Sequence, residues 1–166
     1  MARWLSGALG LGIVTTLAAC AAPPPPPPPT VVELTLVAAK DANATPDGQG
    51  APIALRVYQL AGTANFSGAE FFDLFNNDQT TLKTDLVKRD DVTLAPKQSK
   101  NMTITPTTDQ VKAIGVFGAY RDYAGATWRV TADVPAHKTT KITVTAGKTG
   151  LVIAPAGTAP AGSSGS

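Results

Sequence analysis

The sequence has little of the chemistry on which catalytic and metal sites are usually built. Its 166 residues include one cysteine, Cys20, and one histidine, His137. A lone cysteine cannot form an internal disulfide, and a lone histidine with no free thiol beside it disfavours a zinc site. We therefore expect no metal and no cofactor. The chain also offers no set of residues suited to an enzyme such as a cell-wall hydrolase.

An excess of charge and a long apolar segment are missing as well. The chain has 14 lysines and arginines against 12 aspartates and glutamates, a net charge of +2, so nothing indicates nucleic-acid binding. Its N-terminal apolar stretch, residues 4–17, is shorter than the ~20 residues that a membrane-spanning helix needs. No later segment is apolar for long enough, and we expect no transmembrane span in the mature protein.

The first twenty residues have the order of a secretory signal. Arg3 is followed by the apolar stretch, and the small residues Ala18 and Ala19 come directly before Cys20. This order predicts a signal peptide over residues 1–19. A cysteine at that point is typical of a lipoprotein, in which its thiol takes up lipid. The alternative is an ordinary secretory signal with a chance cysteine.

Residues 20–30 are predicted to form the lipidated start of the mature chain and a stalk. The residue after the cysteine is Ala21 and not aspartate, which favours the periplasmic face of the outer membrane under the general sorting rule for lipoproteins. The prolines of residues 23–29 favour extended polyproline II, which at ~3.1 Å per residue makes a spacer of roughly 20 Å. The alternative is a proline-rich ligand for a partner domain. Residues 154–166 contain no large apolar residue and are predicted to be a disordered tail.

Alternation with a period of two dominates residues 31–153. In the first run Val32, Leu34 and Leu36 alternate with Glu33 and Thr35, as in a half-buried strand. Similar runs cover residues 53–60, 85–94, 98–105, 112–120, 127–133, 139–145 and 150–153. Turn-forming residues separate them, which predicts one mainly β domain, an antiparallel two-sheet β-sandwich.

One segment breaks this alternation. Ser67 and Glu70 have the spacing of a capping box at the start of a helix. An apolar face follows, with a further turn over residues 78–83. The residues of this face are Phe71, Phe72, Leu74 and Phe75. The sequence therefore predicts a short helical insertion between strands.

The connection after the first strand, residues 40–52, is long for a hairpin, where two to five residues are usual. Its residue types hold turns well, and such a connection is either slack or functional. The residues alone leave both readings open. The candidate partner-binding residues are Lys40, Asp41, Ala42, Asn43, Ala44, Thr45, Pro46, Asp47, Gly48, Gln49, Gly50, Ala51 and Pro52.

Charged residues on the predicted strands suit structural roles. Asp90 and Asp91 are adjacent, so in a strand they point to opposite faces and cannot act on one bond together. With Lys88 and Arg89 before them, they are expected to form an ion pair with a neighbouring strand. The remaining histidine, His137, is expected at the surface of a turn between strands.

Aromatic residues provide the alternative function, a module that binds carbohydrate or a small ligand. Arg56 and Tyr58 share one face of their strand, and a sandwich aromatic is usually part of the core. Exposed aromatics could instead form a binding platform. The candidates for such a platform are Tyr58, Tyr120, Tyr123 and Trp128.

A series of motifs in order carries a family resemblance. They are Leu17-Ala18-Ala19-Cys20, Pro46-Asp47-Gly48-Gln49-Gly50-Ala51-Pro52, Leu55-Arg56-Val57-Tyr58-Gln59-Leu60, Phe66 with Ala69-Glu70-Phe71-Phe72, Asp85-Leu86-Val87-Lys88-Arg89-Asp90, Leu94-Ala95-Pro96, Ile114-Gly115-Val116, Tyr120-Arg121-Asp122 and Ala126-Thr127-Trp128-Arg129. The series, from about residue 31 to 153, resembles the outer-membrane lipoprotein of the type VI secretion system, the TssJ, VasD or SciN family.

That resemblance implies a transthyretin-like β-sandwich with added helices, anchored by lipid and without catalytic activity. It implies docking onto the periplasmic C-terminal region of the inner-membrane subunit TssM, and through TssM an indirect link to TssL. In that family the loop after the first strand is implicated in the contact, which transfers here to residues 40–52. The motifs at residues 57–60 and 120–122 are expected to hold the sandwich together.

Overall fold

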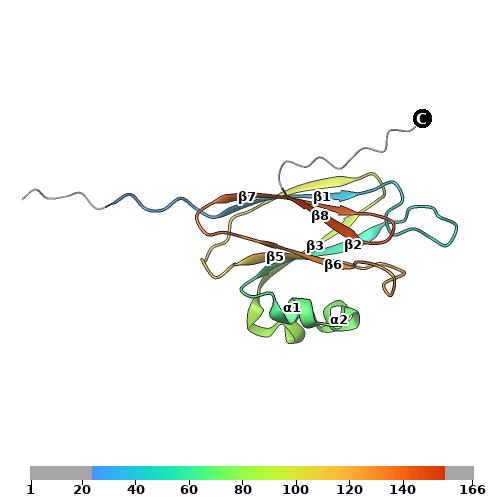
Figure 1. Ribbon diagram of the computed structural model, residues 1–166, viewed down its shortest axis with the longest axis horizontal. Helices are drawn as coiled ribbons and strands as arrows, with labels where there is room; N and C mark the ends of the chain where they lie inside the picture. The colour runs from blue at the N-terminus through green and yellow to red at the C-terminus, as the bar shows by residue number, and fades with distance from the viewer. Residues whose placement is uncertain (1–23, 156–166) are drawn as a thin grey trace, which may run out of the picture.

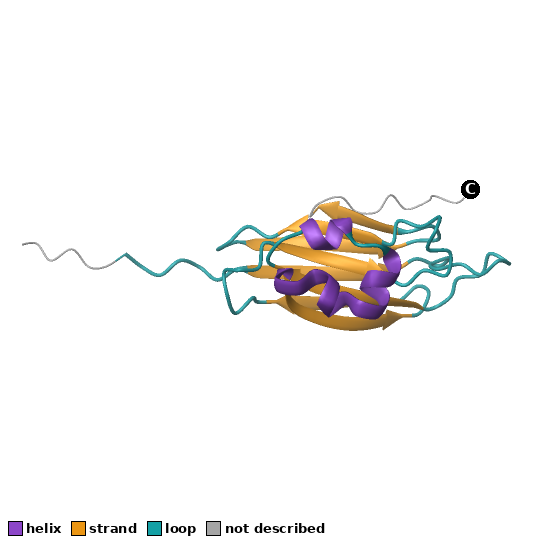
Figure 2. Cartoon of the chain, turned by 90° about the horizontal axis from the view of Figure 1, so that it is seen from below, coloured by secondary structure: helices purple, strands orange, loops and turns teal. Residues whose placement is uncertain are grey.

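The computed structural model describes residues 24–155, which form two stacked β-sheets with helices against one of them (Figure 1). The strands are β1 (Val31–Ala38), β2 (Ile53–Leu60), β3 (Leu86–Leu94), β4 (Ser99–Ile104), β5 (Ala113–Gly118), β6 (Arg129–Asp133), β7 (Thr139–Ala146) and β8 (Leu151–Pro155). One sheet has the order β4-β1-β7-β8 and the other β3-β2-β5-β6. Between β2 and β3, α1 (Ala64–Gly68), α2 (Phe71–Leu82) and the 3-10 turn η1 (Lys83–Asp85) cover the second sheet (Figure 2). The mainly β two-sheet sandwich with a short helical insertion is confirmed.

Parts of the predicted organisation fall outside this range. The predicted signal peptide (1–19), the lipidation residue Cys20 and residues 156–166 of the predicted tail lie beyond the described residues. The last strand continues past residue 153 to Pro155. Within residues 24–155, no helix has the length and apolar character that crossing a bilayer requires.

One strand pair differs from the expected antiparallel arrangement. β1 pairs with β4 in antiparallel fashion but with β7 in parallel, with Val31 opposite Thr139 and Ala38 opposite Ala146. Parallel neighbours need a long crossover connection, and here the whole second sheet lies between the two strands in sequence. Alternation of apolar residues identifies the buried face of a strand but not its direction. The sequence pattern therefore could not predict that β1 and β7 are parallel.

Alternate residues of the strands fill the core between the sheets. In β1, Val32, Leu34 and Leu36 are at most 1% exposed, whereas Glu33 between them is exposed. Burial of such a side chain stabilises the fold by about 1.5–3 kcal/mol. The residues of β2 and β7 that join the same cluster are Ile53, Leu55, Val57, Ile142, Val144 and Ala146.

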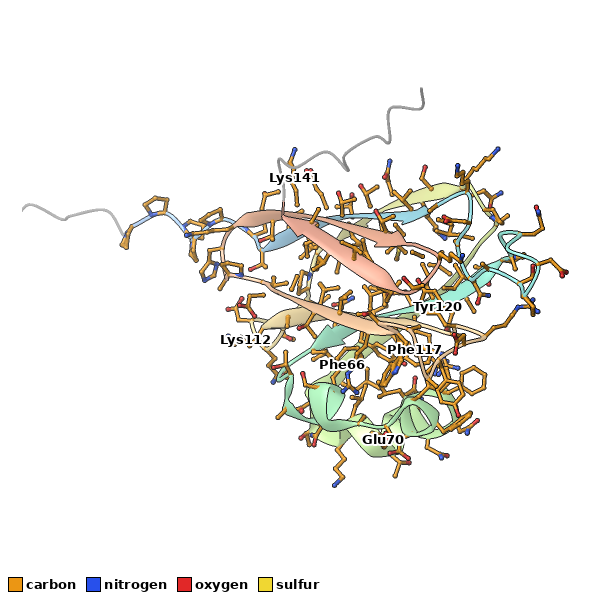
Figure 3. All side chains as sticks on the ribbon, turned by 45° about the vertical axis from the view of Figure 1, so that its right-hand side comes forward. Phe66, Glu70, Lys112, Phe117, Tyr120 and Lys141 are labelled. Carbon is orange, nitrogen blue, oxygen red and sulfur yellow. The ribbon has the colours of Figure 1, made fainter. Side chains whose placement is uncertain are left out.

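A second apolar cluster joins the β3-β2-β5-β6 sheet to the helices, with Phe66 and Phe117 between them (Figure 3). The expected capping box of Ser67 and Glu70 is wrong. Ser67 lies inside α1, and Glu70 instead caps α2 with Asp73, whose carboxylate accepts a hydrogen bond from the Glu70 N–H at 3.4 Å. Ser67 belongs to α1, a separate short helix that packs the fully buried Phe66 5.6 Å from the Tyr58 ring, so Ser67 cannot cap α2.

The helix α2 bends at Asn77, where φ is −137° and ψ is 36°. A bend leaves backbone carbonyls without their helical donors. Arg56 of β2 supplies a donor, because its Nη1 bonds the carbonyl oxygens of Leu74 at 2.8 Å and Phe75 at 2.9 Å. Its guanidinium carbon also lies 5.6 Å from the centre of the Phe75 ring. One strand arginine thus fixes the first half of α2 to the sheet.

Asp78, directly after the bend, is 5% exposed and accepts hydrogen bonds from the Tyr58 hydroxyl at 2.9 Å and Arg89 Nη1 at 2.8 Å. Arg56 Nη1 lies 3.6 Å from the same carboxylate oxygen. Burial alone raises the pKa of Asp78, but the hydrogen bonds from Arg89 and Tyr58 and the charges of both arginines outweigh it and lower the pKa below its usual value. The ionised carboxylate therefore ties the helices to β2 and β3.

The expected ion pair between neighbouring strands is present. Asp91 of β3 faces Arg56 of β2, with 3.4 Å between Oδ1 and Nε, and Arg89 Nη2 lies 3.2 Å from its other oxygen. Asp90 instead pairs with Lys88 at 3.2 Å. The two aspartates thus have separate partners, as the strand geometry predicts.

We predict that Asp78→Asn lowers the free energy of unfolding by about 2–4 kcal/mol at neutral pH, because Arg89 and Arg56 lose their buried counter-charge. The pKa of Asp78 is lowered in the folded state, so this stabilisation is fully present above pH ~3.9, the pKa of an ordinary aspartate. It is lost as the pH falls through the folded-state pKa of Asp78. Urea unfolding at several pH values between 7 and 2 measures the difference, which should shrink at the acid end. The control Asp90→Asn breaks a pair in which Lys88 is exposed and Asp90 half-buried, and should cost under ~1 kcal/mol. Equal losses in the two variants would contradict the assignment.

Candidate docking surface

Three connections meet at the end of the sandwich that lies opposite the stalk (Figure 1). They are the β1–β2 connection, the β5–β6 connection (119–128) and the β7–β8 turn (147–150). A hollow of about 470 Å³ lies among them, lined by Ala44, Thr45, Pro46, Arg121, Asp122, Lys148 and Thr149. The predicted partner-binding loop is therefore one wall of a surface that three distant segments build.

Asn43 joins the three connections. Its amide Nδ2 donates to the Pro52 carbonyl at 2.8 Å, and its Oδ1 accepts from the Arg121 N–H at 2.9 Å. Its own N–H bonds the Gly147 carbonyl at 3.3 Å. With φ at 47°, Asn43 is in the left-handed region, which asparagine tolerates better than most residues. The side chain is 6% exposed, so it acts as a buried tether.

The tip of the loop is a tight turn. The Thr45 N–H bonds the Gln49 carbonyl at 2.8 Å, and the Thr45 hydroxyl accepts from the Gln49 N–H at 3.2 Å. Pro46 follows Thr45 with its φ already fixed, and Gly48 takes the left-handed φ of 79° that closes the turn. The loop is thus held by its own hydrogen bonds and is not slack.

The thirteen predicted residues divide into a base and a tip. The base holds the buried Ala42, Asn43 and Ala51, with the Ala51 N–H bonded to the Ala42 carbonyl at 2.9 Å. The exposed residues are Lys40, Pro46, Asp47, Gly48, Gln49 and Pro52, and the half-buried ones are Asp41, Ala44, Thr45 and Gly50. A partner can therefore reach the tip and the two ends of the loop, Lys40 and Pro52, and not the buried Ala42, Asn43 and Ala51.

The other two connections are also linked to each other. The Thr127 N–H bonds the Thr149 carbonyl at 3.1 Å, and the Leu151 N–H bonds the Thr127 carbonyl at 2.7 Å. At Gly150, where φ is 149°, a Cβ would come within 2.6 Å of the Thr127 nitrogen, so only glycine fits. Together with Asn43 these bonds order the surface, and an ordered surface would lose less conformational entropy if a partner bound there.

Three of the four aromatic candidates for a binding platform, Tyr58, Tyr120 and Trp128, are buried or partly buried. Tyr58 and Tyr120 are buried at 0% and 4% exposure, and burial raises the pKa of both hydroxyls. Trp128 is partly buried against the core, and the Arg129 guanidinium carbon lies 4.4 Å from the centre of its ring. Of the four candidates, Tyr123 remains exposed, with its ring stacked 4.6 Å from Phe71 of α2.

Other residues predicted to be surface or structural groups are where the sequence places them. His137 is an exposed residue of the β6–β7 turn. Within the part of the chain that the structure describes, no group of histidine, cysteine, aspartate and glutamate has a geometry suited to a metal ion. Arg121, Lys148 and the tethering role of Asn43 were missed. Asn43 and Arg121 are 78 positions apart, so no local signal connects them.

Comparison with known families gives one match that spans most of the chain. Residues 30–149 match the family model T6SS-SciN, described as "Type VI secretion lipoprotein, VasD, EvfM, TssJ". Among curated protein sequences none matches the chain.

Three solved structures have the same fold. The type VI secretion lipoprotein TssJ1 from Pseudomonas aeruginosa is 38% identical with a TM-score of 0.75, and the match covers 80% of this chain and 100% of that one. Lip from Serratia marcescens, described as a membrane bound component of the type VI secretion system, is 28% identical with a TM-score of 0.69, covering 76% and 98%. A chain of the structure described as "T6SS protein TssM C-terminal domain (869-1107) from EAEC" is 26% identical with a TM-score of 0.60, covering 76% and 98%.

We predict that Asn43→Ala lowers the free energy of unfolding by about 2–3 kcal/mol, because it leaves the Arg121 N–H without its acceptor and places alanine in the left-handed region. Asn43→Gly should cost less, since glycine accepts that φ. Urea unfolding followed by tryptophan fluorescence measures both. As a matched control, Asn101→Ala on the exposed side of β4 should change stability by less than ~0.5 kcal/mol. A loss at Asn43 no larger than at Asn101 would show that the tether contributes nothing.

Proposed function

The chain belongs to the type VI secretion lipoprotein family of TssJ and VasD, and from this premise we propose that it is the lipid-anchored docking subunit of that system's membrane complex. In this proposal Cys20 carries lipid in the outer membrane, on its periplasmic face. The ordered surface at the far end binds the periplasmic C-terminal region of TssM, and the protein reaches TssL indirectly through TssM. Its role is binding and not catalysis.

The proposal rests on the positions of the stalk and the loop tip, which lie at opposite ends of the sandwich (Figure 1). The stalk leaves the sandwich beside the start of β1, and the tip of the predicted loop projects at the other end (Figure 1). A lipid anchor on the stalk would therefore leave the docking surface facing away from the membrane. Stable anchoring needs more than one acyl chain, which a lipoprotein cysteine provides at ~0.8 kcal/mol per buried CH₂.

One of the similar structures supports TssM as the partner. The TssM domain named in its description has the residue span 869-1107, which is longer than our whole chain of 166 residues. The match covers 76% of our chain and 98% of the matched chain, so the matched chain must be shorter than that domain. The match is therefore to another chain of the same structure, which supports the assignment of TssM as the molecule beside a chain of this fold.

We predict that Cys20→Ser leaves the fold intact and abolishes retention in the membrane, because the hydroxyl cannot take the place of the thiol in lipid attachment. Membrane fractionation with circular dichroism of the released protein measures both effects. Secretion by the host should fall to the level of a deletion strain. Full secretion with a released protein would contradict the role of the anchor.

Binding can be tested on the loop tip alone, because replacing residues 40–52 entirely would remove the buried base. We predict that the triple change Pro46→Ala, Asp47→Ala and Gln49→Ala weakens binding of the periplasmic TssM domain at least about tenfold, or ~1.4 kcal/mol. Calorimetric titration of a soluble form beginning at residue 24 measures the affinity. The tip residues are exposed, so the fold should be retained.

The control for this titration is a second triple change of exposed residues on side strands, Lys88→Ala, Lys100→Ala and Asn101→Ala, which should leave the affinity within about twofold. Equal losses in both variants would move the contact away from the tip. If the unmodified protein does not bind TssM, docking itself is refuted.

A further inference from the structure

The end of the stalk is bound to the sandwich at a site that the proposed docking does not use. His137 of the β6–β7 turn makes two contacts with it. Its backbone N–H donates to the Thr30 hydroxyl at 2.8 Å, and its ring Nδ1 lies 3.0 Å from the Pro28 carbonyl oxygen. Next along the chain, the Val31 N–H bonds the Lys138 carbonyl at 3.0 Å. Successive residues of the stalk are thus held by one turn.

The chemistry of these contacts matches a proline segment. Proline has no N–H, and in polyproline II the carbonyls have no internal partners, so such a segment can only accept hydrogen bonds. A site that holds it must therefore offer donors and apolar surface. His137 offers the donors when Nδ1 carries a proton, and Pro106 supplies apolar surface opposite the stalk.

These residues enclose a small cleft of about 240 Å³ around the stalk. Its walls on the sandwich side are Pro106, Thr107, Thr108, Asp109 and His137, and its wall on the stalk side is Pro27, Pro28, Pro29 and Thr30. The sandwich wall comes from two connections, β4–β5 and β6–β7, so the cleft is a feature of the fold.

The backbone of the turn supports the same interpretation. His137 has a φ of 60°, in the left-handed region where glycine or asparagine is expected at a turn. Histidine adopts this region more readily than most residues other than glycine. Glycine would adopt the same φ but would offer no ring donor to the stalk.

We propose that His137 and the β4–β5 connection form an intramolecular binding site for polyproline, whose ligand is the chain's own stalk and which fixes the direction in which the stalk leaves the sandwich. The bound end continues into a stiff proline run, so a fixed direction at the base becomes a fixed orientation of the whole domain. The site for the stalk needs no lipid. Only its consequence, a fixed orientation of the domain at a membrane, rests on the proposed lipid anchor.

Spin-label distances in the mature chain test the proposal. Cysteines introduced at Pro24 and Lys100 carry the labels, and the mass of the protein reports separately whether Cys20 is lipidated and so unable to take a label. An unlipidated Cys20 would refute the anchor, and the distances would then be measured in the Cys20→Ser background. We expect a single narrow distribution of distances in the parent and one at least about twofold wider in His137→Gly and in Thr30→Val, where a flexible base releases the stalk.

The matched control is Lys97→Gly. Lys97 is also exposed, with a left-handed φ of 68°, and lies in the β3–β4 turn at the other end of the sandwich. It should leave the distribution unchanged. A broad distribution in the parent, or the same width in the parent and in both stalk-site variants, would overturn the proposal.

A second readout identifies the hydrogen bond itself. His137 is the only histidine of the sequence, so its ring nitrogens give one set of signals in nitrogen-15 NMR. The proposal expects the neutral ring to carry its proton on Nδ1, facing the Pro28 carbonyl. A neutral ring with its proton on Nε2 would overturn the bond to the stalk.

Discussion

The parallel pairing of β1 with β7 is the interaction on which both ends of the molecule depend. Its ladder runs from Val31 and Thr139 to Ala38 and Ala146. Beyond the first end, the Val31 N–H continues it to the carbonyl next to His137, where the stalk is held. Beyond the second end, Asn43 continues it to the β7–β8 turn. The stalk and the candidate docking surface thus share one hydrogen-bonded strand pair, which sets the geometry between them.

The helical insertion supports the docking surface from the side. Buried charges are expensive to desolvate, and the cluster around Asp78 is tolerated because its carboxylate has close donors from two strands. This holds α2 in a fixed place, where Phe71 stacks on Tyr123 of the β5–β6 connection. The insertion therefore steadies one of the three segments that form the docking surface.

The sequence predicted those features that local patterns determine. Runs of β-forming residues between turn signals located the eight described strands, of which β1 alternates as a half-buried strand must and β5 is buried throughout, and the family resemblance pointed to the loop. The sequence could not predict features that depend on contacts between distant segments. The direction of β7, the bond between Asn43 and Arg121 and the burial of Asp78 depend on segments far apart in the chain. The predicted capping box was wrong because Ser67 belongs to α1, a separate short helix that ends before Glu70.

Among residues 24–155, each sheet ends in strands that pair with a further strand on one side only: β4 and β8 in one sheet, β3 and β6 in the other. Such edges are templates for pairing with another molecule. Here β3 carries the charged run of Lys88, Arg89, Asp90 and Asp91, and β8 ends in Pro155, which has no N–H to offer. The proposed lipid anchor would confine copies to one membrane plane, where they would meet at high local concentration. The charges on β3 and the proline at the end of β8 would disfavour pairing of these two edges between neighbouring copies.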